Sequence, residues 1–454
     1  MRKPSLHCQE LLRLASSPTV DNGILVETLR KLGGSHEPAV LPRFVPFILY
    51  PEPAVALAAR QAVRRLLQAT PARDLVWLDQ TLRRGCRQNG PGGRAALEAW
   101  DRLRPGWLTQ AAQEPQGLVV LLAASMHHSG YVRQAAVQLL ARWTLQTPVA
   151  EGLEAGAEVP FVLLRLNDWV GPVQQAAVAA IEQRLVAEYA PQLVRCIYLV
   201  EQLATYRRRD HETVLQVLRQ FLSRAGRPAL LAGLTATDRL VQRHCFTRLM
   251  EDSAVSARAV VLAGLASSDT LVRVWAARAA RRRLYGPDLV EALGQARRDR
   301  AVPVRMEAVY AFIDDHPELQ VLLLDPCKSI RETVRFYIRK HATIDFAALY
   351  RQALHTATPA RLPIILLALG ETGSKSDAAC VLPYTTKAQL RVRKAALCAL
   401  GQLDPETAVP ILFAALSDPH RGVRRTAWEA LRPRVDLLTP EQLQVWLPLR
   451  EQYQ

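Results

Sequence analysis

The chain has 454 residues, of which 49% are hydrophobic and only 6% aromatic, so we expect a core of Leu, Val and Ala. Its formal net charge of +16 favours an anionic partner without identifying one. The seven cysteines form no Cys-x-x-Cys pair, which argues against a disulfide framework or a zinc site. We see no signal peptide and no apolar stretch that could span a bilayer, and we therefore expect a cytoplasmic protein with reduced thiols and no membrane span.

Residues 1–115 have a helical pattern but no regular repeat. Apolar spacing predicts helices over Pro53–Leu67 and Arg94–Leu103, and the glycine-rich stretch Gly85–Gly93 predicts a flexible loop between them. We interpret residues 1–115 as degenerate helical repeats that form an N-terminal cap. Residues 116–454 are predicted to form the repeat array itself.

A short motif, Val-Arg-x-x-Ala, recurs through the second region. Its exact copies begin at Val132, Val272, Val304, Val392 and Val423. A conservative copy begins at Ile330, and copies beginning at Val173 and Val241 carry Gln in place of Arg. The starts at 241, 272 and 304 are 31 and 32 residues apart, and those at 392 and 423 are again 31 apart. A unit of this length predicts a repeat architecture.

The spacing within one unit predicts its structure. Val423, Ala427 and Leu431 share one face of a helix. An aspartate stands three to five residues before most copies, where it can accept hydrogen bonds from free N–H groups at the helix start. A pair of short helices cannot bury its apolar face alone, so neighbouring pairs must stack. The sequence therefore predicts an all-α fold, an α-solenoid (superhelix) of stacked antiparallel helical hairpins in repeats of about 31 residues.

The fullest form of the motif, Asp-Pro-x-x-x-Val-Arg-x-x-Ala over Asp418–Ala427, resembles the HEAT-like repeats named after the phycobilisome lyases. The resemblance covers roughly residues 116–454 and implies an armadillo-like helical scaffold. The same fold family includes lyases and alkylpurine DNA glycosylases, so the resemblance also implies an enzyme as an alternative. The iron-binding His-Glu pairs of the related deoxyhypusine hydroxylase are matched only by His36-Glu37 and His211-Glu212, in unrelated registers.

The arginine of the motif recurs in phase, which favours a structural role. We expect a ladder in which each arginine bridges to an acidic residue or a carbonyl group of the neighbouring unit. The expected members are Arg273, Arg305, Arg331, Arg393 and Arg424, with Asp269, Asp299, Asp325 and Asp418.

Other basic side chains form clusters that are candidates for anion binding, with solvated helix faces as the alternative. The candidates are Arg281, Arg282, Arg283, Arg335, Arg339 and Lys340. In the helix predicted over Ile330–Lys340, we expect Arg335, Arg339 and Lys340 to be largely free of ion pairs. Arg207–Arg209 and Arg297-Arg298 are further clusters.

No catalytic, metal-binding or cofactor-binding set is evident. Gly370–Lys375 has the wrong spacing for a phosphate-binding loop, and it follows a predicted helix, where glycine is expected as a C-cap. The sequence therefore favours a non-catalytic scaffold with a protein partner. Nucleic-acid or polyanion binding through arginines is the first alternative, and a lyase or glycosylase activity is the second.

Overall fold

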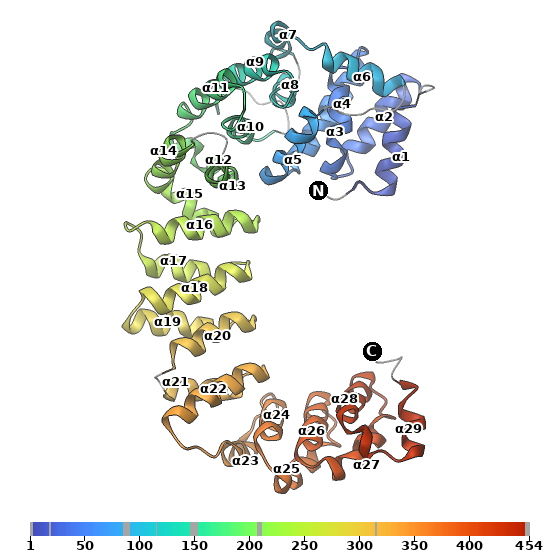
Figure 1. The fold of residues 1–454 in the computed structure, drawn as a ribbon, viewed down its shortest axis with the longest axis vertical. Coiled ribbons are helices and arrows are strands. Elements are labelled where there is room, and N and C mark those ends of the chain that lie inside the picture. Colours follow the sequence, from blue (N-terminus) through green and yellow to red (C-terminus); the bar gives the residue numbers. More distant parts are fainter. Residues whose placement is uncertain are drawn as a thin grey trace. The chain divides into compact units, whose positions relative to one another are not determined.

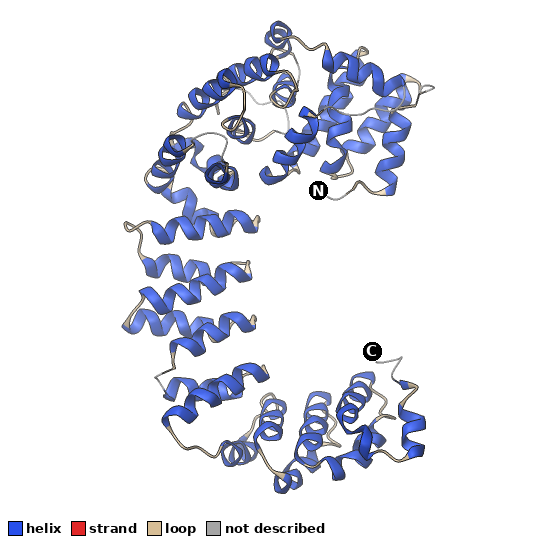
Figure 2. Cartoon of the chain, in the orientation of Figure 1, coloured by secondary structure: helices blue, strands red, loops and turns tan. Residues whose placement is uncertain are grey.

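The computed structural model describes residues 3–17, 20–84, 91–114, 116–145, 153–206, 211–313 and 316–449. Within these ranges every regular element is a helix, and no β-strand is present (Figure 2). The predicted all-α fold is confirmed. No helix in the described ranges is long and apolar enough to cross a membrane.

The chain divides into two compact units, residues 1–272 and 273–454. The boundary predicted at 115/116 falls inside the first unit. Whether residues 1–115 act as a cap stays a proposal.

Unit 1 contains seventeen α-helices in its described part, coloured blue to yellow-green in Figure 1. They are α1 (Leu6–Ala15), α2 (Asn22–Gly33), α3 (Leu41–Phe44), α4 (Pro53–Gln68), α5 (Ala72–Arg83), α6 (Pro91–Asp101), α7 (Pro105–Ala111), α8 (Gly117–Ala124), α9 (Gly130–Ala141), α10 (Val159–Arg165), α11 (Gly171–Glu182), α12 (Ala190–Arg195), α13 (Ile197–Gln202), α14 (Glu212–Ser223), α15 (Arg227–Gly233), α16 (Arg239–Glu251) and α17 (Ala257–Leu265). Short 3-10 helices cover Pro38–Val40, Val45–Leu49, Ala187–Tyr189 and Leu203–Thr205.

Helix α18 (Thr270–Arg283) runs across the division, and unit 2 continues with eleven α-helices in its described part. They are α19 (Gly286–Ala296), α20 (Val302–Ala311), α21 (His316–Val321), α22 (Lys328–His341), α23 (Phe346–Thr356), α24 (Leu362–Thr372), α25 (Ala378–Val381), α26 (Leu390–Leu403), α27 (Pro405–Ala415), α28 (Arg421–Leu431) and α29 (Pro440–Trp446). Short 3-10 helices cover Leu322–Leu324, Lys375–Asp377, Leu382–Tyr384 and Arg432–Leu437.

Each copy of the motif lies in a helix, and the first and fifth residues of each copy are buried. In α28, Val423, Ala427 and Leu431 are buried, as the helical spacing predicts. The two helices predicted in the first region also form, as α4 and α6. The predicted loop Gly85–Gly93 is wrong at its end, because α6 already begins at Pro91, where proline suits the first helical turn. Its first six residues lie outside the described part.

The glycine C-cap expected in the stretch Gly370–Lys375 is present at Gly373, directly after α24. Gly370 lies inside α24, one turn before the end of the helix. A side chain at Gly370 would place its Cβ 2.7 Å from the Cα of Ala399 in α26. The glycine therefore allows α24 and α26 to pack closely, which is a long-range requirement that the local pattern does not reveal.

Helix α5 packs on the inner side of unit 1. It contacts α3 on one side and α10 and α13 on the other, segments more than 70 residues later in the chain (Figure 1). Its buried face presents Leu75, Leu78 and Leu82, together with Asp79. This carboxylate belongs to a buried ionic cluster described below.

Candidate functional site

The motif arginines pair with the aspartate that precedes the next motif helix. Arg273 Nε donates to Asp299 Oδ2 at 2.7 Å. Arg305 repeats this contact with Asp325, through Nε at 2.7 Å and Nη2 at 2.9 Å. In the C-terminal repeats, the Arg393 guanidinium lies 3.1 Å from the Asp418 carboxylate.

The same arginines also hold the turn before their own helix. Nη1 of Arg305 donates to the Asp299 carbonyl oxygen at 2.8 Å, and Nη1 of Arg424 donates to that of Asp418 at 2.7 Å. Each aspartate in turn accepts from a backbone N–H two residues later, as Asp299 does from Ala301 at 2.7 Å. One arginine thus connects two successive turns.

Two contacts of the ladder vary this pairing between a motif arginine and an aspartate. Arg331 pairs with Glu371 at the end of α24 instead of with an aspartate. Asp269 forms an ion pair with Arg243, because Gln242 stands at the position in α16 where other copies of the motif have arginine. The Gln242 amide oxygen accepts from the Ser267 hydroxyl at 2.6 Å, which keeps a link to the same turn.

Unit 1 holds a buried ionic cluster that the sequence did not reveal. Arg133 and Arg165 both donate to Asp168, with nitrogen–oxygen distances of 2.8 and 3.0 Å, and all three side chains are fully buried. Arg165 also pairs with Asp79 of α5. Arg83, from the same helix, lies 3.4 Å from Asp79 and 3.7 Å from Asp168. Three guanidinium groups therefore share two carboxylates.

The predicted anion-binding residues do not form one free basic site. Arg335 is buried and donates to Glu371 at 2.9 Å, so the expectation that it is free is wrong. Its partner Glu371 comes from α24, whereas the helical spacing of α22 relates only residues of that one helix. Arg281 lies 3.5 Å from Glu307.

The remaining candidates are exposed. Arg282, Arg283, Arg339 and Lys340 lie at the surface of unit 2. Arg339 stacks over the ring of Phe346, with 5.3 Å from Cζ to the ring centroid. The cluster Arg207–Arg209 lies outside the described residues.

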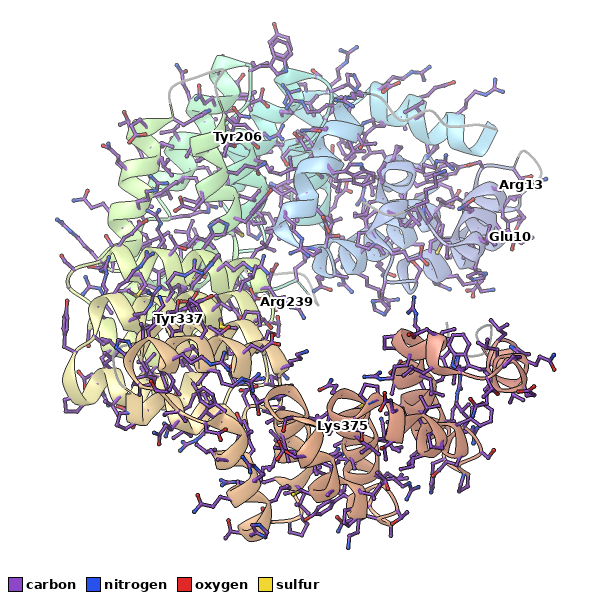
Figure 3. All side chains as sticks on the ribbon, turned by 60° about the horizontal axis from the view of Figure 1, so that its bottom comes forward. Glu10, Arg13, Tyr206, Arg239, Tyr337 and Lys375 are labelled. Atoms are coloured by element: carbon purple, nitrogen blue, oxygen red, sulfur yellow. The ribbon has the colours of Figure 1, made fainter. Side chains whose placement is uncertain are left out.

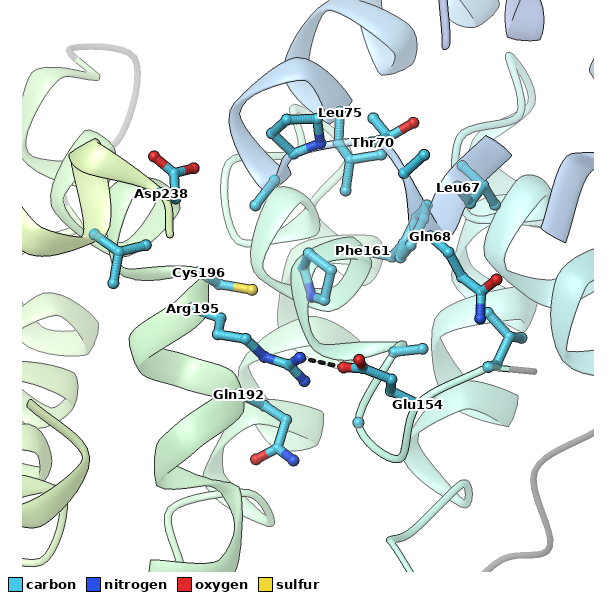
Figure 4. A pocket seen from close by; sticks show the side chains of 18 of the residues that line it. Leu67, Gln68, Thr70, Leu75, Glu154, Phe161, Gln192, Arg195, Cys196 and Asp238 are labelled. Atoms are coloured by element: carbon cyan, nitrogen blue, oxygen red, sulfur yellow. Dashed lines mark hydrogen bonds and ion pairs between the residues drawn. The ribbon is translucent and has the colours of Figure 1, made fainter. Parts of the chain in front are cut away.

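A pocket of ≈ 580 Å³ opens in unit 1 (Figure 4). Its apolar lining comes from separate elements, with Leu75 of α5, Leu122 of α8, Phe161 of α10 and Val241 of α16. Three of these four residues are aliphatic. The apolar part of the lining is therefore assembled from helices distant in sequence.

Charged groups border this pocket. Arg195 of α12 pairs with Glu154, the contact dashed in Figure 4. Asp238, the N-cap of α16, lies 3.2 Å from Arg73 of α5. Burial raises the pKa of the Cys196 thiol in the lining to about 12, so this thiol is neutral at physiological pH.

In the described part of the chain, no group of three or more His, Cys, Asp and Glu side chains is arranged to hold a metal ion. His211 is buried and its Nε2 lies 3.1 Å from the Asn167 side-chain oxygen. This satisfied contact fits a structural role for His211-Glu212.

Residues 381–447 match the family model of HEAT repeats. This segment includes the motif copies at Val392 and Val423, whose helices α26 and α28 pack against each other. The similarity to HEAT repeats is therefore shown for residues 381–447. The finer resemblance to the phycobilisome-lyase type stays a prediction. No curated protein sequence matches the chain significantly.

Among solved structures, the chain is similar to Kap95p in a study of its binding to RanGDP, with 14% identity and a TM-score of 0.31, over 97% of this chain and 57% of that one. Kap121p has 13% identity and a TM-score of 0.32, and the match covers 98% of this chain and 54% of that one. Yeast importin-beta (Kap95p) has 11% identity and a TM-score of 0.28, and the match covers 98% of this chain and 68% of that one. The chain thus spans little more than half of the first two proteins. At these scores the similarity supports no statement about partners.

Proposed function

We propose that the protein is a non-catalytic scaffold that binds a segment of a partner protein, with the pocket of unit 1 as a docking point. The observation that carries this proposal is the open pocket of ≈ 580 Å³ with an apolar floor and a charged border. Its volume falls within the range of ligand pockets, and an apolar centre with a polar rim is the usual anatomy of a protein interface.

Repeat arrays present long surfaces of this kind, because each repeat contacts only its neighbours and leaves a helix face open. Polyanion binding is less well supported as a primary function. Arg281 and Arg335, two of its candidate contacts, are engaged by Glu307 and Glu371. An arginine neutralised by a carboxylate gains little from a phosphate.

The test is to block the pocket and measure partner capture. Ala236 lines the pocket from the turn before α16. We expect Ala236→Trp to reduce capture of the main partner from a lysate at least about tenfold, since a bulky ring would fill the space that the partner needs. Ala232→Trp is the matched control, because Ala232 is exposed on α15 and outside the pocket.

Capture is measured by affinity purification with mass spectrometry, with and without nuclease. The proposal predicts that the partner remains after nuclease treatment. A partner that disappears with nuclease, or one that is retained equally by both tryptophan variants, would contradict docking of a protein in this pocket.

A further inference from the structure

Unit 2 carries aromatic and basic side chains at matching positions of three successive motif helices. Six residues after the first residue of the motif stand Arg278 in α18, Tyr310 in α20 and Phe336 in α22. Each is exposed to solvent: Tyr310 by 38%, Phe336 by 55% and the Arg278 side chain by 47%. Large aromatic side chains in a helix face left open are a signature of an interaction surface.

The same arginine–aspartate contact connects each of these helices to the next, so each is held at the same motif position. Arg273 connects α18 to the turn before α20, and Arg305 makes the same connection from α20 to α22. Equivalent positions of the three helices therefore lie in a row. The Arg278 guanidinium is fixed on the next helix, because Nη2 donates to Glu307 at 2.7 Å.

Cations border this row on both outer helices. Ten residues after the first motif residue stand Arg282 in α18 and Lys340 in α22. Arg281 and Arg339 stand nine residues after it. Glu307 of α20 contacts Arg281 and also Arg278. Among the described residues of the row and its border, the cations therefore outnumber the carboxylates that contact them.

One cation, Lys340, already covers the Phe336 ring. Lys340 Nζ lies 4.7 Å from the ring centroid of Phe336 and 5.3 Å from that of Tyr337. The two rings pack edge to face at 5.3 Å (Tyr337 is labelled in Figure 3). A nucleic-acid base would have to displace the ammonium group to stack on this face of Phe336. A carboxylate could instead pair with the ammonium where it stands.

We propose that Arg278, Tyr310, Phe336 and Lys340, with Arg282 and Arg339, form an aromatic–basic surface that binds an acidic segment of a partner protein. Carboxylates of the segment pair with the bordering cations, and apolar side chains between them lie on Tyr310 and Phe336. The inference deepens the proposed scaffold function, which it assumes, but it concerns a separate surface in the other unit.

The binding test uses three labelled probes on the full chain. They are a synthetic peptide that alternates Glu-Glu with Leu-Trp, a poly-glutamate peptide of equal net charge, and oligothymidylate. We expect the mixed peptide to bind most tightly, with an affinity that falls as salt is raised. Fluorescence anisotropy gives the dissociation constants.

Two variants assign the binding to this surface. Arg282→Glu with Lys340→Glu should weaken binding of the mixed peptide at least about tenfold, through lost attraction and added repulsion. Phe336→Ala should weaken the mixed peptide but not poly-glutamate, since it removes apolar contact. The matched control is Arg361→Glu with Arg391→Glu, which makes the same charge change at exposed positions elsewhere in unit 2.

Three results would overturn the inference. The mixed peptide could fail to bind, it could bind the control and the surface variants equally, or oligothymidylate could bind more tightly and lose its affinity in the same charge reversal. The last result would assign the surface to nucleic acid. Ala236→Trp should leave peptide binding unchanged, so failure of this inference and failure of the unit 1 pocket are separable.

Discussion

The buried arginines of unit 1 depend on very few carboxylates. Burial acts to raise the pKa of Asp168, but the hydrogen bond from Arg133 and the charge of Arg165 outweigh it and lower the pKa. The ionised carboxylate is thus what makes burial of these guanidinium groups tolerable.

We expect Asp168→Ala to lower the free energy of unfolding by roughly 3–5 kcal/mol, because it leaves buried charges unpaired. Urea unfolding followed by circular dichroism measures the change. Glu98→Ala serves as the control, since Glu98 forms an exposed pair with Arg102 that should contribute less than about 1 kcal/mol. Equal losses in the two variants would contradict this account of the cluster.

His127 makes stability depend on pH. Burial lowers its pKa from 6.5 to about 4, and its ring is used as neutral imidazole. Nδ1 accepts from the Ser129 N–H at 3.0 Å, while Nε2 lies 2.9 Å from the Trp100 carbonyl oxygen. Protonation of Nδ1 would break the first of these bonds.

Between pH 6.5 and about 4, the unfolded chain binds a proton at His127 and the folded chain does not. The free energy of unfolding should therefore fall as the pH falls through this window. We expect His127→Gln to reduce this slope in urea titrations at several pH values. His355→Gln, at an exposed position, should leave the slope unchanged. An unaltered slope in His127→Gln would exclude this role.

The thiols should differ widely in reactivity. Burial raises the pKa of Cys245 to about 12, whereas a hydrogen bond with Ser329 lowers the pKa of Cys327. Because the thiolate is the nucleophile, Cys327 should react with a thiol reagent in the native protein, and Cys245 only on unfolding. Ser329→Ala should slow the reaction at Cys327. Mass spectrometry of the modified peptides gives both rates.

At the scale of helices, the rungs should differ in strength according to burial. Glu371 pairs with both Arg331 and Arg335, and all three side chains are at most 5% exposed. Asp418 and Arg393 are 13% and 14% exposed, so water screens that pair more. Glu371 also connects α22 to α24 across the intervening α23.

We expect Glu371→Ala to destabilise unit 2 by several kcal/mol, since it leaves two arginines buried without a counter-charge. Asp418→Ala should cost distinctly less. Hydrogen exchange of α22 and α24 should rise in the first variant, while α26 and α28 respond to the second. The reverse order of effects would show that burial does not set the strength of these rungs.

The sequence predicted the helices and their contacts where these depend on a local pattern of residues. The in-phase motif placed Val423 in the core and Arg273 and Arg305 beside acidic groups of neighbouring repeats. It could not reveal the pairing of Arg335, whose partner lies 36 residues later, nor the cluster between α5 and α10. Such contacts depend on how helices pack against each other. Asp79 lies in the region without a regular repeat, so no motif position indicates its role. The pocket was missed for the same reason, since its walls come from separate helices.

At the scale of the whole molecule, far-ultraviolet circular dichroism should show a helical spectrum with no appreciable strand content. All regular elements in the described ranges are helical. A substantial sheet signal would contradict the fold. The seven cysteines need not be paired for this structure, and the described ones are free thiols.

The regular rungs also have a consequence for how such a chain can change its length. Each regular repeat offers an arginine to the repeat after it and an aspartate to the one before it. Loss of residues 299–324 would remove one hairpin and bring Asp325 to the place of Asp299 opposite Arg273. The spacing is kept, because Asp325 precedes Ile330 by five residues, as Asp299 precedes Val304. Duplication or loss of such a hairpin in evolution leaves each ladder arginine opposite an aspartate, although the exposed Arg278 would lose Glu307. A cut between Arg331 and Glu371 or through the α5 cluster would instead leave buried arginines unpaired. Variation in repeat number should therefore concentrate around α18–α22.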